Sequence, residues 1–312
     1  MTKQKKGTVR KLGILAGNGV LPTVLIEQCQ KEGRPFFVLA LKGHAEEDLL
    51  PKNIPIKWVR LGSAGKMYRL LKSNNVNDLV MIGGVRRPSL SEIFPDFYGW
   101  KLICKIGLKK HGDDGLLRRI VQEIEHLGFF VRGIHEFLPE LLAPEGVLTK
   151  VKPSSVDIED ISRGCYIAKL LGLGDVGQSV IVQQGLVLSV EGIEGTKALI
   201  ERTVQLRRKG KGGVLVKTAK PMQDTRVDLP TIGTETVKSV AQAGLKGIAV
   251  EVGKVLIPNV ADVIAKANQL NIFVIGVNTN TFIPPILHER LNVLTGVGCR
   301  KNNQKSDKRK GR

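Results

Sequence analysis

Residues 12–85 contain, in order, LGILAG (12–17), LPTVLIEQCQKEG (21–33), FFVLAL (36–41), GKMYRLLKSNNV (65–76) and DLVMIGGV (78–85). Short apolar runs alternate here with segments of helical periodicity. This strand-helix-strand-helix-strand order is typical of a parallel sheet wound by helices. The sequence therefore predicts an α/β fold that begins with an N-terminal Rossmann-like parallel-sheet domain.

The second half of the chain predicts a different strand pattern. FFVRG (129–133) continues the first domain as one more strand, and the segment after it is rich in Pro and Gly. Beyond it the sequence predicts a helix within 157–175 with Gly172 and Gly174 at its end, a hairpin turning near Gln184 and Gly185, and then alternating helices and strands as far as IFVIGV (272–277). We therefore expect a C-terminal mixed α/β domain. The predicted boundaries are a basic N-terminal tail at 1–10, the N-terminal domain at 11–138, a connector at 139–148, a C-terminal catalytic domain at 149–278 and a basic C-terminal tail at 279–312.

The net charge of +19 over 312 residues is concentrated at the two ends of the chain. Residues 1–11 hold five basic residues and no acid, and residues 301–312 hold six basic residues and one acid. These ends predict solvated tails, with attraction to an anionic membrane or to RNA as the alternatives. Nucleic acid is not expected as the functional partner.

The cysteines and the hydropathy pattern exclude several classes of protein. The four cysteines form no CxxC pair and have no histidine at ligand spacing, which argues against a disulfide framework and a zinc site. No uninterrupted apolar run reaches transmembrane length, so a reducing cytoplasm is the expected setting. The histidines accompany no nucleophile motif such as GxSxG, so acyl transfer by a catalytic triad is not expected.

Two glycine turns follow predicted strands of the first domain. In the first, Gly17-Asn18-Gly19 ends a strand, and Pro22 stands in the first turn of the next helix, an arrangement that lets a phosphate or sugar approach the backbone. A dinucleotide fingerprint would need Gly or Ala at position 22, which argues against an NAD site. A tight structural turn is the alternative. Since GGVRRP (83–88) ends another strand, both turns should open at one sheet edge. The predicted ligand-binding residues here are Gly17, Asn18, Gly19, Val20, Gly83, Gly84 and Arg86.

The loop KTAKPMQDTRVDLPTIG (217–233) is the strongest candidate for the chemistry. If the part after Pro221 is extended, Asp224, Arg226 and Asp228 share one face. Two carboxylates provide the oxygen ligands that Mg²⁺ prefers, while Arg and Lys neutralise phosphate oxygens. This pattern predicts a clamp for a metal-bound diphosphate, with Lys217 and Gln223 among the binding residues. A surface turn with a salt bridge is the alternative.

Further candidates come from neighbouring segments. Glu194, Gly195 and Thr196 follow a predicted strand and are expected to bind substrate, although Thr196 could instead cap the next helix. Lys101, Lys105 and Lys109 recur at helical spacing, which fits either a helix lying on an anionic bilayer or an ordinary surface helix.

Taken together, these motifs and their order resemble the LpxI family, the UDP-2,3-diacylglucosamine pyrophosphatases of lipid A biosynthesis. The likeness rests on LGILAGNGVLP, GGVRRP, GDDGLLR, DVGQSVIV, VEGIEGT and LVKTAKPMQDTRVDLPTIG. It implies two domains and a Mg²⁺-dependent attack of water on the α-phosphorus of UDP-2,3-diacylglucosamine. The products would be UMP and 2,3-diacylglucosamine 1-phosphate, called lipid X. The essential aspartate of the family lies in its QDxRxDLP element, which is residues 223–230 here, and Asp224 is favoured over Asp228.

The resulting hypothesis is a cytoplasmic hydrolase, peripheral to the inner membrane at its cytoplasmic face. Asp224 and Asp228 are expected to hold Mg²⁺, while Arg226 and Lys217 stabilise developing charge. The oligomeric state stays open and includes a homo-oligomer. The alternatives are another sugar-nucleotide enzyme, a transferase or dehydrogenase, and a nucleic-acid-binding protein that acts through its basic tails.

Overall fold

The computed structural model describes residues 10–85, 95–106, 113–210 and 212–295. The chain divides into two compact units. Unit 1 contains Met1–Glu140 together with the short segment Asp224–Asp228, and unit 2 contains Leu141–Gln223 and Leu229–Arg312. The predicted α/β class, with a parallel sheet in the N-terminal part and a separate mixed sheet in the C-terminal part, is confirmed.

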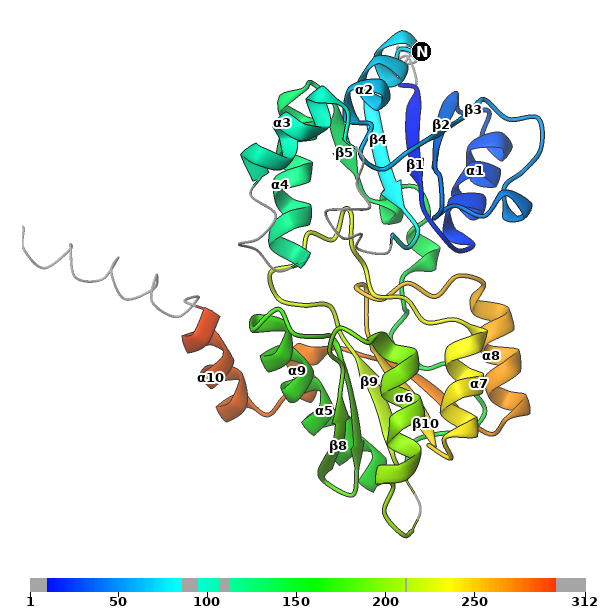
Figure 1. Ribbon diagram of the computed structural model, residues 1–312. Coiled ribbons are helices and arrows are strands. Elements are labelled where there is room, and N and C mark those ends of the chain that lie inside the picture. The colour runs from blue at the N-terminus through cyan, green and yellow to red at the C-terminus, as the bar shows by residue number, and fades with distance from the viewer. Residues whose placement is uncertain (1–9, 86–94, 107–112, 211, 296–312) are drawn as a thin grey trace, which may run out of the picture. The chain divides into compact units, whose positions relative to one another are not determined.

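Unit 1 is built around a five-stranded parallel sheet with strand order β3-β2-β1-β4-β5 (Figure 1). Its strands are β1 Leu12–Ala16, β2 Phe36–Leu41, β3 Ile56–Val59, β4 Asp78–Ile82 and β5 Phe130–Arg132. Its helices are α1 Leu21–Lys31, α2 Ala64–Ser73, α3 Phe97–Ile106 and α4 Asp113–His126, with short 3₁₀ turns at Glu47–Leu49, Ile134–Glu136 and Pro139–Leu141.

Strand β2 is buried along its whole length, which requires helices on both faces of the sheet. Phe37, Leu39 and Leu41 pack with apolar residues of α2 and α4 on one face. The strand order reverses between β1 and β4, because the chain crosses from β3 back to the other side of β1. In open α/β sheets, ligands bind at the carboxyl ends of the strands at such a point.

Unit 2 contains a six-stranded mixed sheet with order β6-β11-β10-β9-β7-β8 (Figure 1). Its strands are β6 Gly146–Val147, β7 Ser179–Gln183, β8 Leu186–Val190, β9 Val214–Lys217, β10 Gly247–Glu251 and β11 Phe273–Val277. Its helices are α5 Ser155–Leu173, α6 Gly195–Leu206, α7 Thr234–Gln242, α8 Val260–Gln269, α9 Thr279–Phe282 and α10 Pro285–Thr295.

Alternate residues of the central strands of unit 2 point into two separate apolar layers. Leu215 and Ile248 pack with α6, α7 and α8 on one face of the sheet. Val216 and Ala249 pack with α5 and with Leu291 of α10 on the other. The period of two along each strand therefore produces a three-layer sandwich in which both sheet faces are buried.

The hairpin between β7 and β8 turns at the predicted residues. Gln184 and Gly185 both have positive φ, 53° and 75°, as the tight two-residue turns of hairpins require. The buried carboxylate of Asp160 on α5 accepts hydrogen bonds from both backbone N–H groups, at 2.9 and 2.6 Å. The turn is thus fixed to the helix beneath it.

Two segments differ from the sequence-based expectation. Residues 279–295, expected as the first part of the C-terminal tail, form α9 and α10, because Ile283 and Leu291 are buried against the α5 face. Within the expected connector, Gly146–Val147 pairs with β11 as an edge strand. Residues 1–9, 296–312, Arg86 and Lys109 lie outside the described residues. Among the described helices, none combines the length and apolar character needed to cross a bilayer.

Candidate functional site

The two glycine turns of unit 1 are joined to each other at the carboxyl edge of β1 and β4, as predicted. The N–H of Asn18 donates to the carbonyl of Gly84 at 2.8 Å, and the N–H of Gly84 donates to the carbonyl of Asn18 at 2.8 Å. Because β1 and β4 are neighbours in the sheet, the bridge closes the edge where the strand order reverses.

The two turns approach each other so closely that only glycine fits at positions 17 and 83. A Cβ added to Gly17 would lie 2.5 Å from the carbonyl oxygen of Gly84. Gly83 has φ +95°, and a Cβ there would lie 2.7 Å from the carbonyl oxygen of Asn18. No side chain fits at either position without displacing backbone.

The next two residues remain open to a ligand. Gly19 has φ +94°, and apart from its two chain neighbours no described residue has an atom within 4 Å of the place where its Cβ would stand. Val20 is half exposed at the start of α1, and no side-chain hydrogen bond caps this helix among the described residues. Of the predicted residues, Gly17, Asn18, Gly83 and Gly84 therefore form the joined turns, while Gly19 and Val20 present accessible backbone at a helix N-terminus.

In unit 2, a polar chain of hydrogen bonds starts at the end of β9. The buried ammonium group of Lys217 donates to Oγ1 of Thr196 at 2.7 Å. The Thr196 hydroxyl donates to Oε1 of Glu191 at 2.6 Å, and the backbone N–H of Gln178 donates to Oε2 of Glu191 at 3.2 Å. The chain thus brings together residues next to the ends of three strands, β7, β8 and β9. They are Gln178, Glu191, Thr196 and Lys217.

Thr196 does not cap helix α6, so that structural alternative is wrong. The helix begins at Gly195 with Glu194 as its N-cap residue, and Thr196 lies in the first turn with its hydroxyl facing Lys217 and Glu191. Glu194 instead forms an ion pair with Arg202 at 2.6 Å. Hydrogen bonds from its own backbone N–H and from Gly192, together with Arg202, lower the pKa of Glu194.

The loop after β9 is fixed to the same edge of unit 2. The Lys220 ammonium lies 2.6 Å from the carboxylate of Asp175. The backbone N–H of Lys220 donates to the side chain of Gln223 at 3.0 Å, and the Gln223 amide donates to Gln178 at 3.4 Å. Gln223 is therefore linked to the Lys217 chain through Gln178.

The segment with Asp224, Arg226 and Asp228 is a turn, so the extended conformation considered for it is wrong. The N–H groups of Val227 and Asp228 both donate to the carbonyl of Asp224 at 3.1 Å, and the N–H of Arg226 donates to its Oδ1 at 3.1 Å. Short acidic side chains favour such turns because they bond their own backbone.

The turn places a guanidinium group directly on the candidate carboxylate. Arg226 donates from Nε to Oδ1 of Asp224 at 3.0 Å and from Nη2 to Oδ2 at 2.8 Å. Its Nη1 donates to Glu125 of α4 at 2.7 Å within the same unit. The hydrogen bonds from Arg226 lower the pKa of Asp224, so its carboxylate is ionised at neutral pH.

A magnesium site is not preassembled in the described residues, where no three His, Cys, Asp or Glu side chains are grouped to hold a metal. The chemistry of Asp224 nevertheless fits one, because Oδ2 of its ionised carboxylate accepts one hydrogen bond, from Nη2 of Arg226, and keeps a second lone pair. Mg²⁺ is commonly bound by one or two carboxylates together with substrate phosphates and water. The residues present therefore fit an ion that binds with a diphosphate.

Lys169 and Glu251 form a buried ion pair that sequence reasoning did not single out. Their charged groups are 2.6 Å apart. Ala219, between the two loop lysines, donates its N–H to Glu251 at 3.0 Å and accepts from Lys169 at 2.9 Å. Burial alone would raise the pKa of Glu251, but the charges and hydrogen bonds of Lys169 and Lys254 together outweigh it, and the pKa is lowered. The available signal was a lysine inside the apolar stretch of α5 and a glutamate at the end of the apolar strand β10.

Comparisons with known proteins agree with the order of these motifs. Residues 11–141 match the model of the LpxI N-terminal domain, and residues 144–275 match that of the LpxI C-terminal domain. The chain belongs to the LpxI family. An LpxI relative from Caulobacter vibrioides, named UDP-2,3-diacylglucosamine pyrophosphatase LpxI, is 40% identical over 277 residues, covering 86% of this chain and 98% of that protein. The resemblance found in the sequence is confirmed.

Two solved structures resemble a part of this LpxI chain, each over 40% of its length or less. The Bordetella bronchiseptica enzyme WbmG in complex with NAD is 17% identical with a TM-score of 0.26, covering 40% of this chain and 36% of that one. The structure of the same enzyme in complex with NAD and UDP is 17% identical with a TM-score of 0.25, covering 38% of this chain and 34% of that one.

Proposed function

We propose that this chain hydrolyses UDP-2,3-diacylglucosamine in lipid A biosynthesis, with Mg²⁺, by attack of water on the α-phosphorus. The products are UMP and 2,3-diacylglucosamine 1-phosphate. The observation that carries the proposal is the 40% identity to the Caulobacter vibrioides pyrophosphatase along 98% of that protein. Each unit, taken by itself, supplies groups suited to a part of the substrate.

The end of β9 provides fixed positive charge for phosphate oxygens. The Lys217 ammonium is buried and held by Thr196, so its position is set before a ligand arrives. Lys220 lies three residues further along the loop, where Ala219 between them is clamped by Glu251 and Lys169. Preorganised cations in a site of low dielectric stabilise charge that develops on transferred phosphoryl groups.

The Asp224 carboxylate acts as an ionised oxygen ligand in this proposal. Because Arg226 lowers its pKa, it is a poor proton acceptor near neutral pH and a good ligand for a hard cation. Bound Mg²⁺ would neutralise charge on the diphosphate oxygens and polarise the phosphorus. Arg226 fixes the orientation of the carboxylate through its two hydrogen bonds.

The open backbone at Gly19 and Val20 fits the nucleotide part of the substrate. Uncapped N–H groups at the start of α1 favour a phosphate or ribose oxygen there. Since the substrate carries two acyl chains, we further propose that the enzyme works at the cytoplasmic face of the inner membrane.

The proposal is tested with purified protein, UDP-2,3-diacylglucosamine and ¹⁸O-water, analysed by mass spectrometry. We expect label in UMP, loss of turnover with EDTA, and recovery when Mg²⁺ is added in excess. Asp224→Ala should abolish turnover, and Asp228→Ala in parallel shows which carboxylate is essential. Label in the sugar phosphate would contradict attack at the α-phosphorus. Full activity of Asp224→Ala and Asp228→Ala in the presence of EDTA would contradict the metal-dependent mechanism.

A further inference from the structure

The arginine bonded to Asp224 has little capacity left for a phosphate. Arg226 donates from Nε and Nη2 to Asp224 and from Nη1 to Glu125. A guanidinium group binds phosphate best through two parallel N–H donors on one edge of its fork. In Arg226 the edge with Nε and Nη2 is occupied by Asp224, and the remaining edge is shared with Glu125. A diphosphate at this turn therefore needs a second cation.

Helix α4 carries a second arginine toward the same turn. Arg118 and Glu125 are seven residues apart on α4, close to two full turns, so they lie on one face of the helix. Glu125 bonds Arg226 at 2.7 Å, which directs this face at the Asp224 turn. All of these residues belong to unit 1.

The charge of Arg118 acts on the Asp224 carboxylate. The hydrogen bonds and charge of Arg226 lower the pKa of Asp224 most, against a rise from burial, and the charge of Arg118 lowers it further. The Arg118 guanidinium is thus near enough to interact with an anion that Asp224 helps to hold.

Arg118 has no partner among the described residues. Its side chain is half-buried, and its buried Nε–H group donates no hydrogen bond. It also forms no ion pair within the described part of the chain. A buried polar group without a partner costs about 1–3 kcal/mol, and more when it is charged. Such groups are rare in folded proteins and are explained by a bound ion, a water molecule or a role in catalysis.

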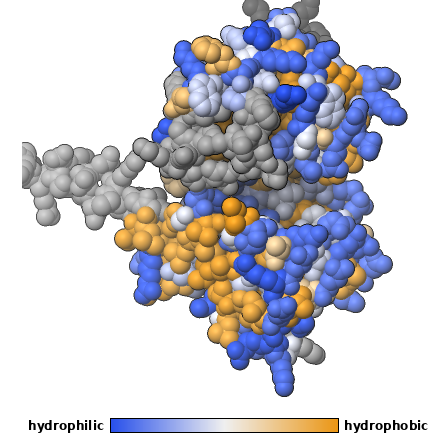
Figure 2. All heavy atoms as spheres, in the orientation of Figure 1, coloured by the Kyte–Doolittle hydropathy of each residue, from blue (hydrophilic) through white to orange (hydrophobic). Residues whose placement is uncertain are grey.

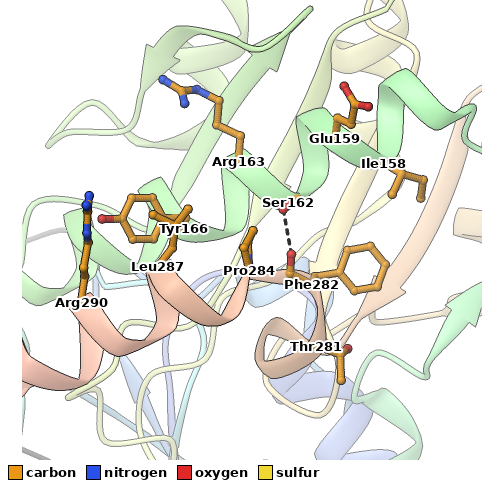
Figure 3. A pocket seen from close by; sticks show the side chains of 10 residues that line it. All are labelled: Ile158, Glu159, Ser162, Arg163, Tyr166, Thr281, Phe282, Pro284, Leu287 and Arg290. Atoms are coloured by element: carbon orange, nitrogen blue, oxygen red, sulfur yellow. Dashed lines mark hydrogen bonds between the residues drawn. The ribbon is translucent and has the colours of Figure 1, made fainter. Parts of the chain in front are cut away.

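The arginines of an apolar groove on unit 2 differ from Arg118 in this respect. Figure 2 shows apolar residues gathered over α5, α9 and α10, where the groove lies. Arg163 of α5 and Arg290 of α10 line it, together with Glu159 (Figure 3). Glu289 is exposed next to Arg290 in the sequence, so positive and negative charges are equal in number around the groove. It therefore offers no net attraction to an anion, and its arginines are suitable controls.

We propose that Arg118 binds the phosphate oxygens of the diphosphate at the Asp224 turn. Arg118 donates its unused N–H groups to these oxygens, while Arg226 stays on Asp224 and fixes the carboxylate. An anion beside ionised Asp224 would otherwise be repelled. This role also accounts for the motif GDDGLLR, which ends at Arg118. The inference rests on the proposed function, because that function supplies the diphosphate.

The test measures binding of UDP with Mg²⁺ to the full chain by isothermal titration calorimetry. UDP carries a diphosphate and lacks the lipid, so its binding is measured without turnover. Arg118→Met removes the charge and all N–H donors, and Arg118→Lys keeps the charge but not the planar fork. The matched control is Arg290→Met, which removes the same charge at the groove of unit 2.

We expect Arg118→Met to weaken UDP binding about 10-fold or more, Arg118→Lys to lose less, and Arg290→Met to bind like the parent chain. Because Arg118→Met removes an unsatisfied buried group, its unfolding temperature should equal or exceed that of the parent chain. If the parent chain binds UDP no better than Arg118→Met does, or if the control loses as much, the proposal is overturned. A lower unfolding temperature for Arg118→Met would assign Arg118 a structural role and also overturn it.

Turnover of detergent-solubilised UDP-2,3-diacylglucosamine separates this inference from the proposed function. Arg118→Met should lower kcat/KM at least as much as it weakens UDP binding, whereas Arg290→Met should leave kcat/KM unchanged. If the parent chain fails to hydrolyse this substrate, the proposed function fails, while the calorimetry of the Arg118 variants still decides whether Arg118 binds a diphosphate.

Discussion

The ammonium of Lys169 and the carboxylate of Glu251 meet 2.6 Å apart in the interior of unit 2, and both form hydrogen bonds with the backbone of Ala219. Thr279 adds a further hydrogen bond to Glu251 at 3.1 Å, and Lys254 lies 3.2 Å from the same carboxylate. The pair therefore connects α5, β10 and the start of the loop that carries Lys220 and Gln223. It positions that loop and is not itself proposed to touch substrate.

Removing one member of this pair should destabilise unit 2 strongly. Lys169→Met leaves Glu251 in a buried position with less compensation, which costs about 3 kcal/mol of unfolding free energy. Lys169→Met/Glu251→Leu should lose less than the sum of the two single variants, because neither charge is then left alone. Urea unfolding measures both. Lys238→Met, at an exposed pair on α7, is the matched control and should hardly move the midpoint. Additive losses in the double variant would contradict the coupling.

In the joined glycine turns of unit 1, alanine should be tolerated at position 84 but not at position 17. Gly17→Ala puts a Cβ against the carbonyl oxygen of Gly84, so we expect a loss of about 1–3 kcal/mol in unfolding free energy and weaker UMP binding. Gly84→Ala is the control, since the nearest described atom to its Cβ would be 3.8 Å away. Its effect should stay within about 0.5 kcal/mol. Equal thermal unfolding temperatures for the two variants would contradict the close approach of the two turns at Gly17.

Much of this fold follows from local sequence patterns. Buried parallel strands read as continuous apolar runs, so β2 and β4 were predictable, as was the β7–β8 hairpin from Gln184 and Gly185. The edge shared by the two glycine turns followed from the strand-helix order alone. Lys217 and Thr196 were each indicated as binding residues by their places after predicted strands.

Other features depend on contacts that a sequence pattern does not contain. The bond between Lys169 and Glu251 joins residues 82 apart, and either charge alone resembles a surface residue. At Asp224, a side-chain hydrogen bond to the backbone of Arg226 overrides the alternation that suggested an extended segment. Helix α10 has weak periodicity and is stabilised by tertiary packing of Leu291.

The hydroxyl of Thr196 should matter for turnover. Thr196→Val keeps the shape of the side chain but removes one acceptor from Lys217 and one donor from Glu191. A hydrogen bond to a charged group contributes about 1.5–3 kcal/mol, so kcat should fall by about 10- to 100-fold as the ammonium loses one of the bonds that fix its position. Thr196→Ser retains the hydroxyl and should keep most of the activity. An unchanged kcat in Thr196→Val would show that the hydrogen bond from Lys217 to Thr196 does not position the ammonium for catalysis.

Arg226 should control the acid limb of the pH–rate profile. Its hydrogen bonds lower the pKa of Asp224 below the ordinary value of 3.8, so in the parent chain this carboxylate gains a proton only in strong acid. Arg226→Gln removes that effect, the pKa rises, and the acid limb of kcat/KM should move to higher pH. Glu125→Gln is the control, because the exposed bond from Arg226 to Glu125 at 2.7 Å leaves the Asp224 fork intact. It should leave the acid limb in place.

The lowered pKa of Asp224 also makes the stability of the fold depend on pH in the same direction. The stabilisation that the ionised Asp224 contributes is present above its unfolded pKa and is lost as pH falls through the lower folded value. If the acid limb of kcat/KM shifts equally in Arg226→Gln and Glu125→Gln, or in neither, the group that titrates in this limb is not Asp224.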